Sequence, residues 1–161
     1  MAFEISSRKL TLDGVGNRTQ RVDDLGTHVY DYDDLYRITD VTYPGPDDVD
    51  YTYDAVGNRE TLVTSAGTAQ YAYDAADRLT SVTPPGAGAI SYTWDDNGNL
   101  EARGSDSFGW DAEDRLVSAT VDSATTTFAY NGDGLRDSLT FDSNTTTFTW
   151  DVTQAARRTT T

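Results

Sequence analysis

Several residue types that carry chemistry are scarce or absent in this sequence. It has no cysteine and one histidine, His28, among 161 residues, and Lys9 is its one lysine. Without cysteine, the chain cannot form disulfide bonds, use a catalytic thiolate or build a cysteine-based zinc site. Carboxylates are many but evenly repeated, whereas a catalytic pair needs two different environments that separate its pKa values. The sequence therefore predicts no enzymatic activity, no catalytic residue and no cofactor.

Positive charge is also scarce. Twelve Lys and Arg against 27 Asp and Glu give a formal net charge of −15 and a pI of about 4.1. This balance disfavours binding to phosphate backbones and to anionic membrane surfaces. No stretch approaches the ~20 apolar residues of a transmembrane helix, and the start, MAFEISSRKLTL, lacks the apolar segment of a signal peptide. We expect no nucleic-acid partner, no membrane insertion and no signal peptide in this chain.

Large apolar residues are few, but aromatic residues are not. Leu, Ile, Val and Phe make up about 18% of the chain, which together with high net charge is typical of disorder. Against this stand 10 Tyr, 3 Trp and 5 Phe, with 25 Thr and with Asp outnumbering Glu by 23 to 4. Thr favours strands and Asp favours turns. The composition therefore predicts an all-β protein.

Eight copies of one motif run through the chain: aromatic-Asp-x-x-(Gly or Asp)-(Asn or Arg)-(Leu or Arg). They start at residues 12, 32, 53, 73, 94, 110, 130 and 150, with 16 to 21 residues between neighbouring starts. Copies with Gly-Asn, such as YDAVGNRE from Tyr53, alternate with copies with Arg, such as YDAADRLT from Tyr73. Repetition at a fixed period indicates a repeat architecture. The sequence predicts one repeat array over residues 1–161.

A second large side chain lies two residues before each motif ring, as in Tyr51/Tyr53 and Phe108/Trp110. This spacing puts both rings on one face of a strand. Fourteen of the 18 aromatic residues belong to such pairs. They are predicted to stack between neighbouring repeats as an aromatic ladder on the covered, inner face of the sheet.

The Asp-x-x-Gly-Asn segment predicts a turn of about five residues, because Asp can bond the following backbone and Gly or Asn accepts a positive φ. A second strand follows and ends at breakers such as PGPDD from Pro44. Each repeat is thus predicted to be one β-hairpin, and the chain an all-β spiral of antiparallel hairpins forming an open, β-solenoid-like sheet. The predicted structural motif residues are Tyr32, Asp33, Tyr53, Asp54, Gly57, Tyr73, Asp74, Arg78, Trp94, Asp95, Gly98, Trp110, Asp111, Arg115, Tyr130, Trp150 and Asp151. Asp74 with Arg78 and Asp111 with Arg115 are expected to pair across the turn and to hold the register.

These motifs closely resemble those of the YD-repeat, or RHS-repeat, family, and the resemblance covers about residues 10–156. The family includes bacterial RHS and wall-associated toxins, insecticidal toxin-complex subunits and animal teneurins. The resemblance implies a ribbon of hairpins that spirals into a hollow shell, often around a toxic C-terminal domain, in an extracellular or cell-surface protein. This chain is shorter than a closed shell requires and lacks the family's DPxGL-type segment and an effector domain.

Two binding alternatives remain open. Asp95, Asp96, Asn97 and Asn99 gather oxygen donors of the kind that Ca²⁺ takes. The plainer interpretation is that Asp caps the turn, and on that interpretation no metal binds. Rows of Tyr and Trp are also typical of surfaces that bind glycans.

An open array of hairpins exposes edge strands, which invite pairing with another chain. The leading hypothesis is therefore a non-catalytic structural protein that self-associates head to tail into a filament or shell. The alternative is a fragment of the YD shell of a polymorphic secreted toxin that encloses an effector. A third hypothesis is an adhesin or glycan-binding module.

Overall fold

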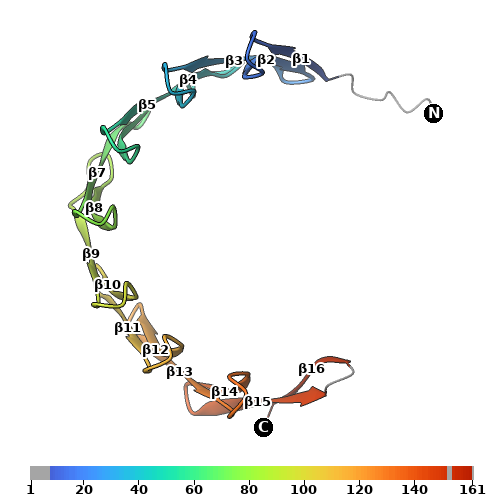
Figure 1. Cartoon of the computed structure of the whole chain (residues 1–161), viewed down its shortest axis with the longest axis vertical. Coiled ribbons are helices and arrows are strands. Elements are labelled where there is room, and N and C mark those ends of the chain that lie inside the picture. The colour runs from blue at the N-terminus through green and yellow to red at the C-terminus, as the bar shows by residue number, and fades with distance from the viewer. Residues whose placement is uncertain (1–7, 152–153, 161) are drawn as a thin grey trace. The chain divides into compact units, whose positions relative to one another are not determined.

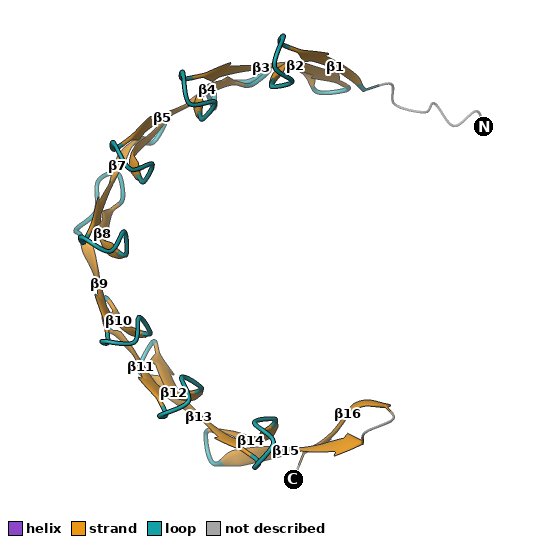
Figure 2. Cartoon of the chain, in the orientation of Figure 1, coloured by secondary structure: helices purple, strands orange, loops and turns teal. Residues whose placement is uncertain are grey.

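The structure is a computed structural model that describes residues 8–151 and 154–160. These residues form sixteen β-strands and no helix, which confirms the all-β class (Figure 1, Figure 2). The strands are β1 (Lys9–Leu12), β2 (Arg18–Asp23), β3 (Gly26–Tyr32), β4 (Ile38–Thr42), β5 (Val49–Tyr53), β6 (Arg59–Thr64), β7 (Gly67–Tyr73), β8 (Leu79–Thr83), β9 (Ile90–Trp94), β10 (Leu100–Arg103), β11 (Asp106–Trp110), β12 (Leu116–Val121), β13 (Ala124–Tyr130), β14 (Arg136–Phe141), β15 (Asn144–Asp151) and β16 (Gln154–Thr160).

The chain divides into two compact units, Met1–Ala89 and Ile90–Thr161. In the first unit, β1 to β8 pair strictly in sequence order, each antiparallel to the next. In the second unit, β9 to β16 do the same. Each unit is therefore a meander of hairpins, as the repeat pattern predicts. That one array runs over all of residues 1–161 stays a prediction.

Successive connections alternate between the two ends of the strands. The motif turns all lie at one end, because each joins an odd-numbered strand to the next even-numbered one. The connections at the opposite end are mostly two-residue turns, such as Asp122–Ser123 between the paired residues Val121 and Ala124. Asp122 and Ser123 both have positive φ, 50° and 68°, which is the I′ geometry that matches the twist of the strands.

A longer loop, residues 43–48, joins β4 to β5 at the end opposite the motif turns. Its Pro44 packs against Gly26, where an added Cβ would lie 2.8 Å from the Pro44 Cβ. Gly26 also has a φ of +124°, a conformation that residues with a Cβ rarely adopt. Glycine is therefore required at this position for two independent reasons.

Each unit is a single layer of sheet with almost no closed core. Among the described residues, the buried apolar side chains are Val41 and Ala69, and the buried polar ones are His28, Asp106 and Thr146. The paired rings are half-buried, and Trp150 is 41% exposed. The expectation of a covered ring face is therefore wrong for the described chain, because no second layer lies over the sheet of either unit. No described segment is a helix long and apolar enough to cross a membrane.

Candidate functional site

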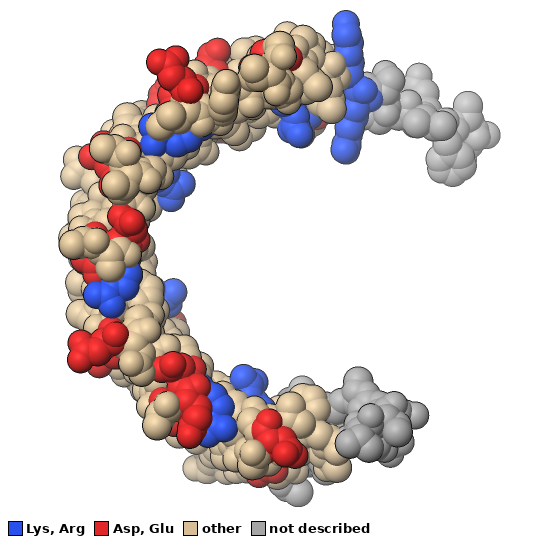
Figure 3. Space-filling model, viewed as in Figure 1, with Lys and Arg blue, Asp and Glu red and all other residues tan. Residues whose placement is uncertain are grey.

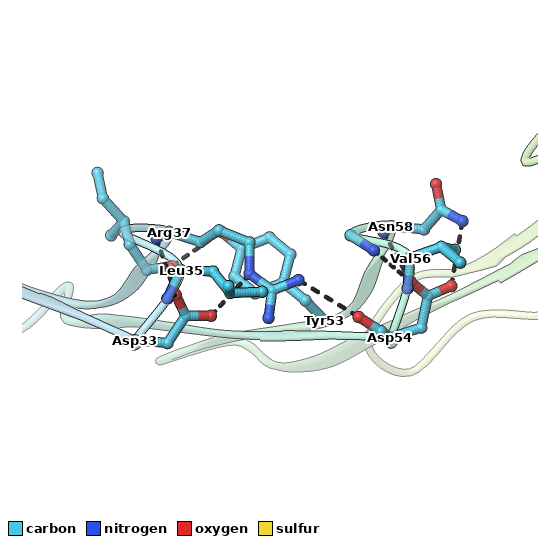
Figure 4. A network of polar contacts seen from close by, with 9 residues as sticks. Asp33, Leu35, Arg37, Tyr53, Asp54, Val56 and Asn58 are labelled. Atoms are coloured by element: carbon cyan, nitrogen blue, oxygen red, sulfur yellow. Dashed lines mark hydrogen bonds and ion pairs between the residues drawn. The ribbon is translucent and has the colours of Figure 1, made fainter.

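The motif turns are built around the carboxylate of the motif Asp. Turn positions are counted from this residue, which is position 0. In the turn of the third copy, Asp54 Oδ1 accepts hydrogen bonds from the backbone N–H groups of Val56, Gly57 and Asn58 at 2.8 to 3.0 Å (Figure 4). Its Oδ2 accepts from Asn58 Nδ2 at 3.1 Å. The Asp54 N–H donates to the carbonyl of Asn58 at 2.9 Å and closes the five-residue turn.

The same geometry recurs in all seven motif turns that the structure describes completely. In each, the position-0 oxygen accepts from the backbone N–H of positions 2 and 4 at 2.7 to 3.0 Å. Position 3 has a positive φ in every case. The residues there are Gly16, Tyr36, Gly57, Asp77, Gly98, Asp114 and Gly134. This confirms the predicted turn and explains the spacing of the motif. The eighth turn, which follows Asp151, lies partly outside the described residues.

Where position 4 is arginine or asparagine, its side chain binds the carboxylate at position 0 of the same turn. Arginine donates through Nε at 2.6 Å from Arg37 to Asp33, and at 2.7 Å both from Arg78 to Asp74 and from Arg115 to Asp111. The structure thus brings together both predicted Asp/Arg pairs. Basic side chains lie next to acidic ones on the surface (Figure 3). The backbone N–H and guanidinium of the position-4 arginine lower the pKa of Asp33 and of Asp74.

The motif ring carries a polar group that reaches the preceding repeat. Tyr53 Oη donates to the carbonyl of Ile38, at position 5 of the preceding turn, at 2.8 Å. Pairing between β4 and β5 starts only at Asp40 with Asp50, so Ile38 has no register partner on β5. The bond recurs at 2.7 to 3.1 Å from Tyr32, Tyr73, Trp110, Tyr130 and Trp150 to Arg18, Arg59, Leu100, Leu116 and Arg136.

This bond accounts for a regularity of the sequence. Rings at the motif position are always Tyr or Trp, which have a donor, whereas the ring two residues earlier is Tyr or Phe. The first copy has Leu12 at the motif position and can donate no such bond. The ring is also where the register shifts in both units, as between Thr52 and Tyr53. The shift is a β-bulge, which bends the strand locally.

Arginine guanidiniums stack on the rings. Arg37 lies 4.6 Å from the ring centroid of Tyr53, and Arg59 lies 4.2 Å from that of Tyr71, each in the next repeat. Arg18 and Arg115 take similar places, at 5.7 and 5.0 Å from rings of the next repeat, whereas Arg136 lies 4.8 Å from the ring centroid of Phe128 in its own hairpin. On the Tyr53 and Tyr71 rings the described ring-face contact across the junction is a guanidinium, and the stacking of ring on ring between repeats stays a prediction. A cation over a ring face is attracted by the electrons of the ring.

The calcium candidates occupy a motif turn. Both carboxylate oxygens of Asp95 accept hydrogen bonds within that turn, from the N–H groups of Asn97 and Asn99 and from Asn99 Nδ2. The side-chain and backbone amides of Asn99 lower the pKa of Asp95. Asp96 is exposed beside them. Among the residues that the structure describes, no three His, Asp or Glu are placed to hold a metal ion. The geometry thus favours the turn-cap interpretation for Asp95.

The one histidine is a buried structural residue. His28 is 3% exposed, and its Nε2 lies 2.9 Å from an Arg21 nitrogen and 3.4 Å from Asp23 Oδ1. Its ring meets that of Tyr43 edge-on at 5.6 Å. Sequence reasoning missed this cluster, because Arg21, Asp23 and Tyr43 all lie outside the motif. The i, i+2 spacing of Arg21 and Asp23, which puts both side chains on one face of β2, is a signal that could have linked these two.

Comparison with known families decides the assignment. The family model "Teneurin YD-shell" matches residues 15–149. The chain belongs to this family. The match includes the seven motif turns described above, apart from the start of the first. The turn and ring contacts thus lie within the YD-shell repeats of this chain. A search of curated proteins found no match.

Solved structures with the same fold come from toxin complexes. The crystal structure of TcdB2-TccC3 without its hypervariable C-terminal region matches 99% of this chain with a TM-score of 0.75 and 18% identity. The Photorhabdus luminescens Tc holotoxin pore matches 95% with a TM-score of 0.74 and 16% identity. In both cases the match covers 10% of the other chain. The YD-shell chain thus spans about a tenth of the length of these structures.

Proposed function

We propose that this chain is a non-catalytic wall segment of a larger YD shell. The observation that carries the proposal is the single-layer sheet of each unit, which is held together by contacts that repeat from one hairpin to the next. A lone hairpin is marginal in water, and stacked neighbours supply the missing burial. Such an element is suited to form a wall.

The position of the polar contacts supports this role. The motif ring, the position-4 side chain and the stacked guanidinium all reach the neighbouring repeat, as for Tyr53 and Arg37. These contacts hold neighbouring hairpins together, and the shell-type family is consistent with a structural role.

The similar structures suggest where such a wall would belong. They are multi-subunit toxin complexes, and one of them was solved without a hypervariable C-terminal region. A wall segment of this kind would be secreted or lie at the cell surface, and its shell would enclose an effector. Since the match covers 10% of those chains, the remainder of the wall would come from further repeats.

Imaging of the native assembly tests the proposal. An affinity tag inserted in the exposed Asp122–Ser123 turn allows the assembly to be isolated from cells that express the gene. Electron microscopy is expected to show hollow particles with a wall one sheet thick. Filaments built of this chain alone, or single chains, would overturn the shell assignment.

End-to-end self-association is the second candidate. The observation that favours it is strand β1, which among the described residues pairs only with β2 and exposes Leu10 and Leu12 by 53% and 57%. The net charge of −15 opposes association, but salt shortens this repulsion to about 8 Å at physiological ionic strength. Light scattering of the purified chain should then show oligomers that grow with concentration and with salt. A monomer throughout that range would remove this candidate.

A glycan-binding role has less support from the geometry. Sugars stack on open ring faces, and here guanidiniums lie over five of the repeat rings at 4.2 to 5.7 Å. The Trp150 side chain, which is 41% exposed, is where glycan binding would be tested first.

A further inference from the structure

The residue at turn position 4 contacts the next motif turn as well as its own. Asn58 Nδ2 lies 3.1 Å from Asp54 Oδ2 in its own turn and 2.9 Å from Asp77 Oδ1 in the next. In the second unit, Asn99 Nδ2 lies 2.7 Å from Asp114 Oδ1 in the same way. In both cases the acceptor is an aspartate at position 3.

An arginine at position 4 makes a different contact. Arg37 donates from a terminal nitrogen to the backbone carbonyl of Asp54 at 3.3 Å (Figure 4). The same nitrogen lies 3.9 Å from the place a Cβ would take on Gly57, which is position 3 of that turn. Arg115 stands in the same relation to Gly134, at 3.8 Å. In both cases the neighbour at position 3 is glycine, and the guanidinium lies over it.

Backbone geometry explains why these pairs matter. Position 3 has a positive φ in every described motif turn, which glycine adopts freely and other residues adopt at a cost. Aspartate tolerates this conformation better than most residues do. At Asp77 and Asp114 the carboxylate gains a hydrogen bond from the preceding asparagine, which offsets that cost. Opposite arginine, glycine at position 3 takes this conformation without that cost, and the arginine donates to the backbone instead, as Arg37 does to Asp54.

We infer that positions 4 and 3 of successive turns form a pairing code that selects the neighbouring hairpin. Asparagine at position 4 accepts a turn with aspartate at position 3, and arginine accepts a turn with glycine. The inference rests on the proposed wall function, and it specifies which kind of hairpin can pair with each hairpin of the wall. Five of the seven successive pairs in the sequence follow the code, and the exceptions are Asn17 followed by Tyr36 and Leu135 followed by Gln154.

The code also predicts which hairpin would pair with strand β1. The first turn has Gly16 at position 3, so the hairpin that fits beside β1 is one with arginine at position 4. The eighth motif has Ala155 at that place in the sequence, which carries no donor. A YD hairpin with arginine is therefore a better match to β1 than a second copy of this chain joined head to tail.

A double-mutant cycle in the whole chain tests the code. The variants are Asn58→Ala, Asp77→Gly and the double substitution, and urea unfolding gives the equilibrium constant of each. One hydrogen bond across the junction should appear as a coupling factor of about two- to tenfold between the two substitutions. The matched control is the cycle of Asn17→Ala with Tyr36→Gly. No hydrogen bond joins that pair among the described residues, so its coupling factor should be near one.

One further measurement keeps the test decisive if a variant is too unstable for the cycle. Asp77→Gly alone should speed hydrogen exchange at one of the two Asn58 side-chain amide protons, and leave those of Asn17 unchanged. A coupling factor near one or unchanged exchange would each overturn the code. The shell assignment is tested separately by imaging, so either proposal can fail without the other.

Discussion

Replacing Tyr73 with Phe isolates the hydrogen bond that links one repeat to the next. The hydroxyl of Tyr73 donates to the carbonyl of Arg59 at 3.1 Å, and the ring itself is half-buried. The substitution removes the donor and keeps the ring. Arg59 lies beyond the last register pair of β6 with β7, so it has no register partner on β7. Without the Tyr73 hydroxyl, its carbonyl loses the side-chain donor that it has across the junction.

The magnitude follows from the net value of one such bond. An intramolecular hydrogen bond contributes about 0.5–1.5 kcal/mol to the free energy of unfolding. For a chain of this length, that corresponds to a fall in Tm of roughly 1–6 °C. Replacing the ring altogether, by Tyr73→Ala, should cost about 2 kcal/mol, since a fully buried ring costs about 3–5 kcal/mol and this one is half-buried.

The control is Tyr71→Phe, two residues earlier on the same face of β7. No hydroxyl hydrogen bond of Tyr71 is present in the described structure, and the equivalent position holds Phe in later repeats, as at Phe108. We expect its Tm to stay within a degree or so of the natural chain. Thermal and urea unfolding followed by circular dichroism measure both variants. Equal losses for Tyr71→Phe and Tyr73→Phe would refute the linking role of the motif hydroxyl.

Four other expectations follow from single contacts. Because hydrogen bonds lower the pKa of the turn aspartates below the ordinary value of 3.8, the stability they provide is present above that pH and should be lost as the pH falls below it, seen as a falling urea midpoint. The facing carboxyl of Asp40 raises the pKa of Asp50, so Asp50→Asn should raise the urea midpoint at neutral pH and lose this advantage in acid, where the pair is protonated; no change at neutral pH would count against the pair. Gly26→Ala should destabilise the chain by more than about 1 kcal/mol, through its positive φ and its contact with Pro44, whereas Gly45→Ala, in open space, should not; equal midpoints would contradict this. A chelator should leave Tm nearly unchanged, and a large drop that calcium but not magnesium reverses would establish a calcium site.

The fold could be predicted from the sequence because its determinants are local. The positive φ at position 3 favours Gly or Asp, which hold six of the seven described places, and the backbone bonds of the turn close within five residues. The i, i+2 spacing of the rings fixes the face on which they lie. A periodic pattern with these features specifies hairpins wherever it occurs.

The partners of those residues could not be predicted in the same way. Ring-on-ring stacking was expected and stays a prediction, whereas the contacts of the Arg37 and Arg59 guanidiniums with ring faces were not expected. Burial of the rings was also expected, but a single sheet has no second layer to cover them. Both outcomes depend on how neighbouring hairpins lie in the sheet, which the local pattern of one repeat does not specify.

The sequence by itself therefore determined the all-β class, the hairpin unit, the turn built on the motif aspartate and the family resemblance. Each of these rests on interactions between residues a few positions apart, whose geometry the backbone fixes. Only the tertiary structure decided that Tyr53 donates to Ile38, that Asn58 reaches Asp77 and that His28 is buried beside Arg21. These contacts join residues from different strands or repeats, and their geometry exists only once the strands have paired in register.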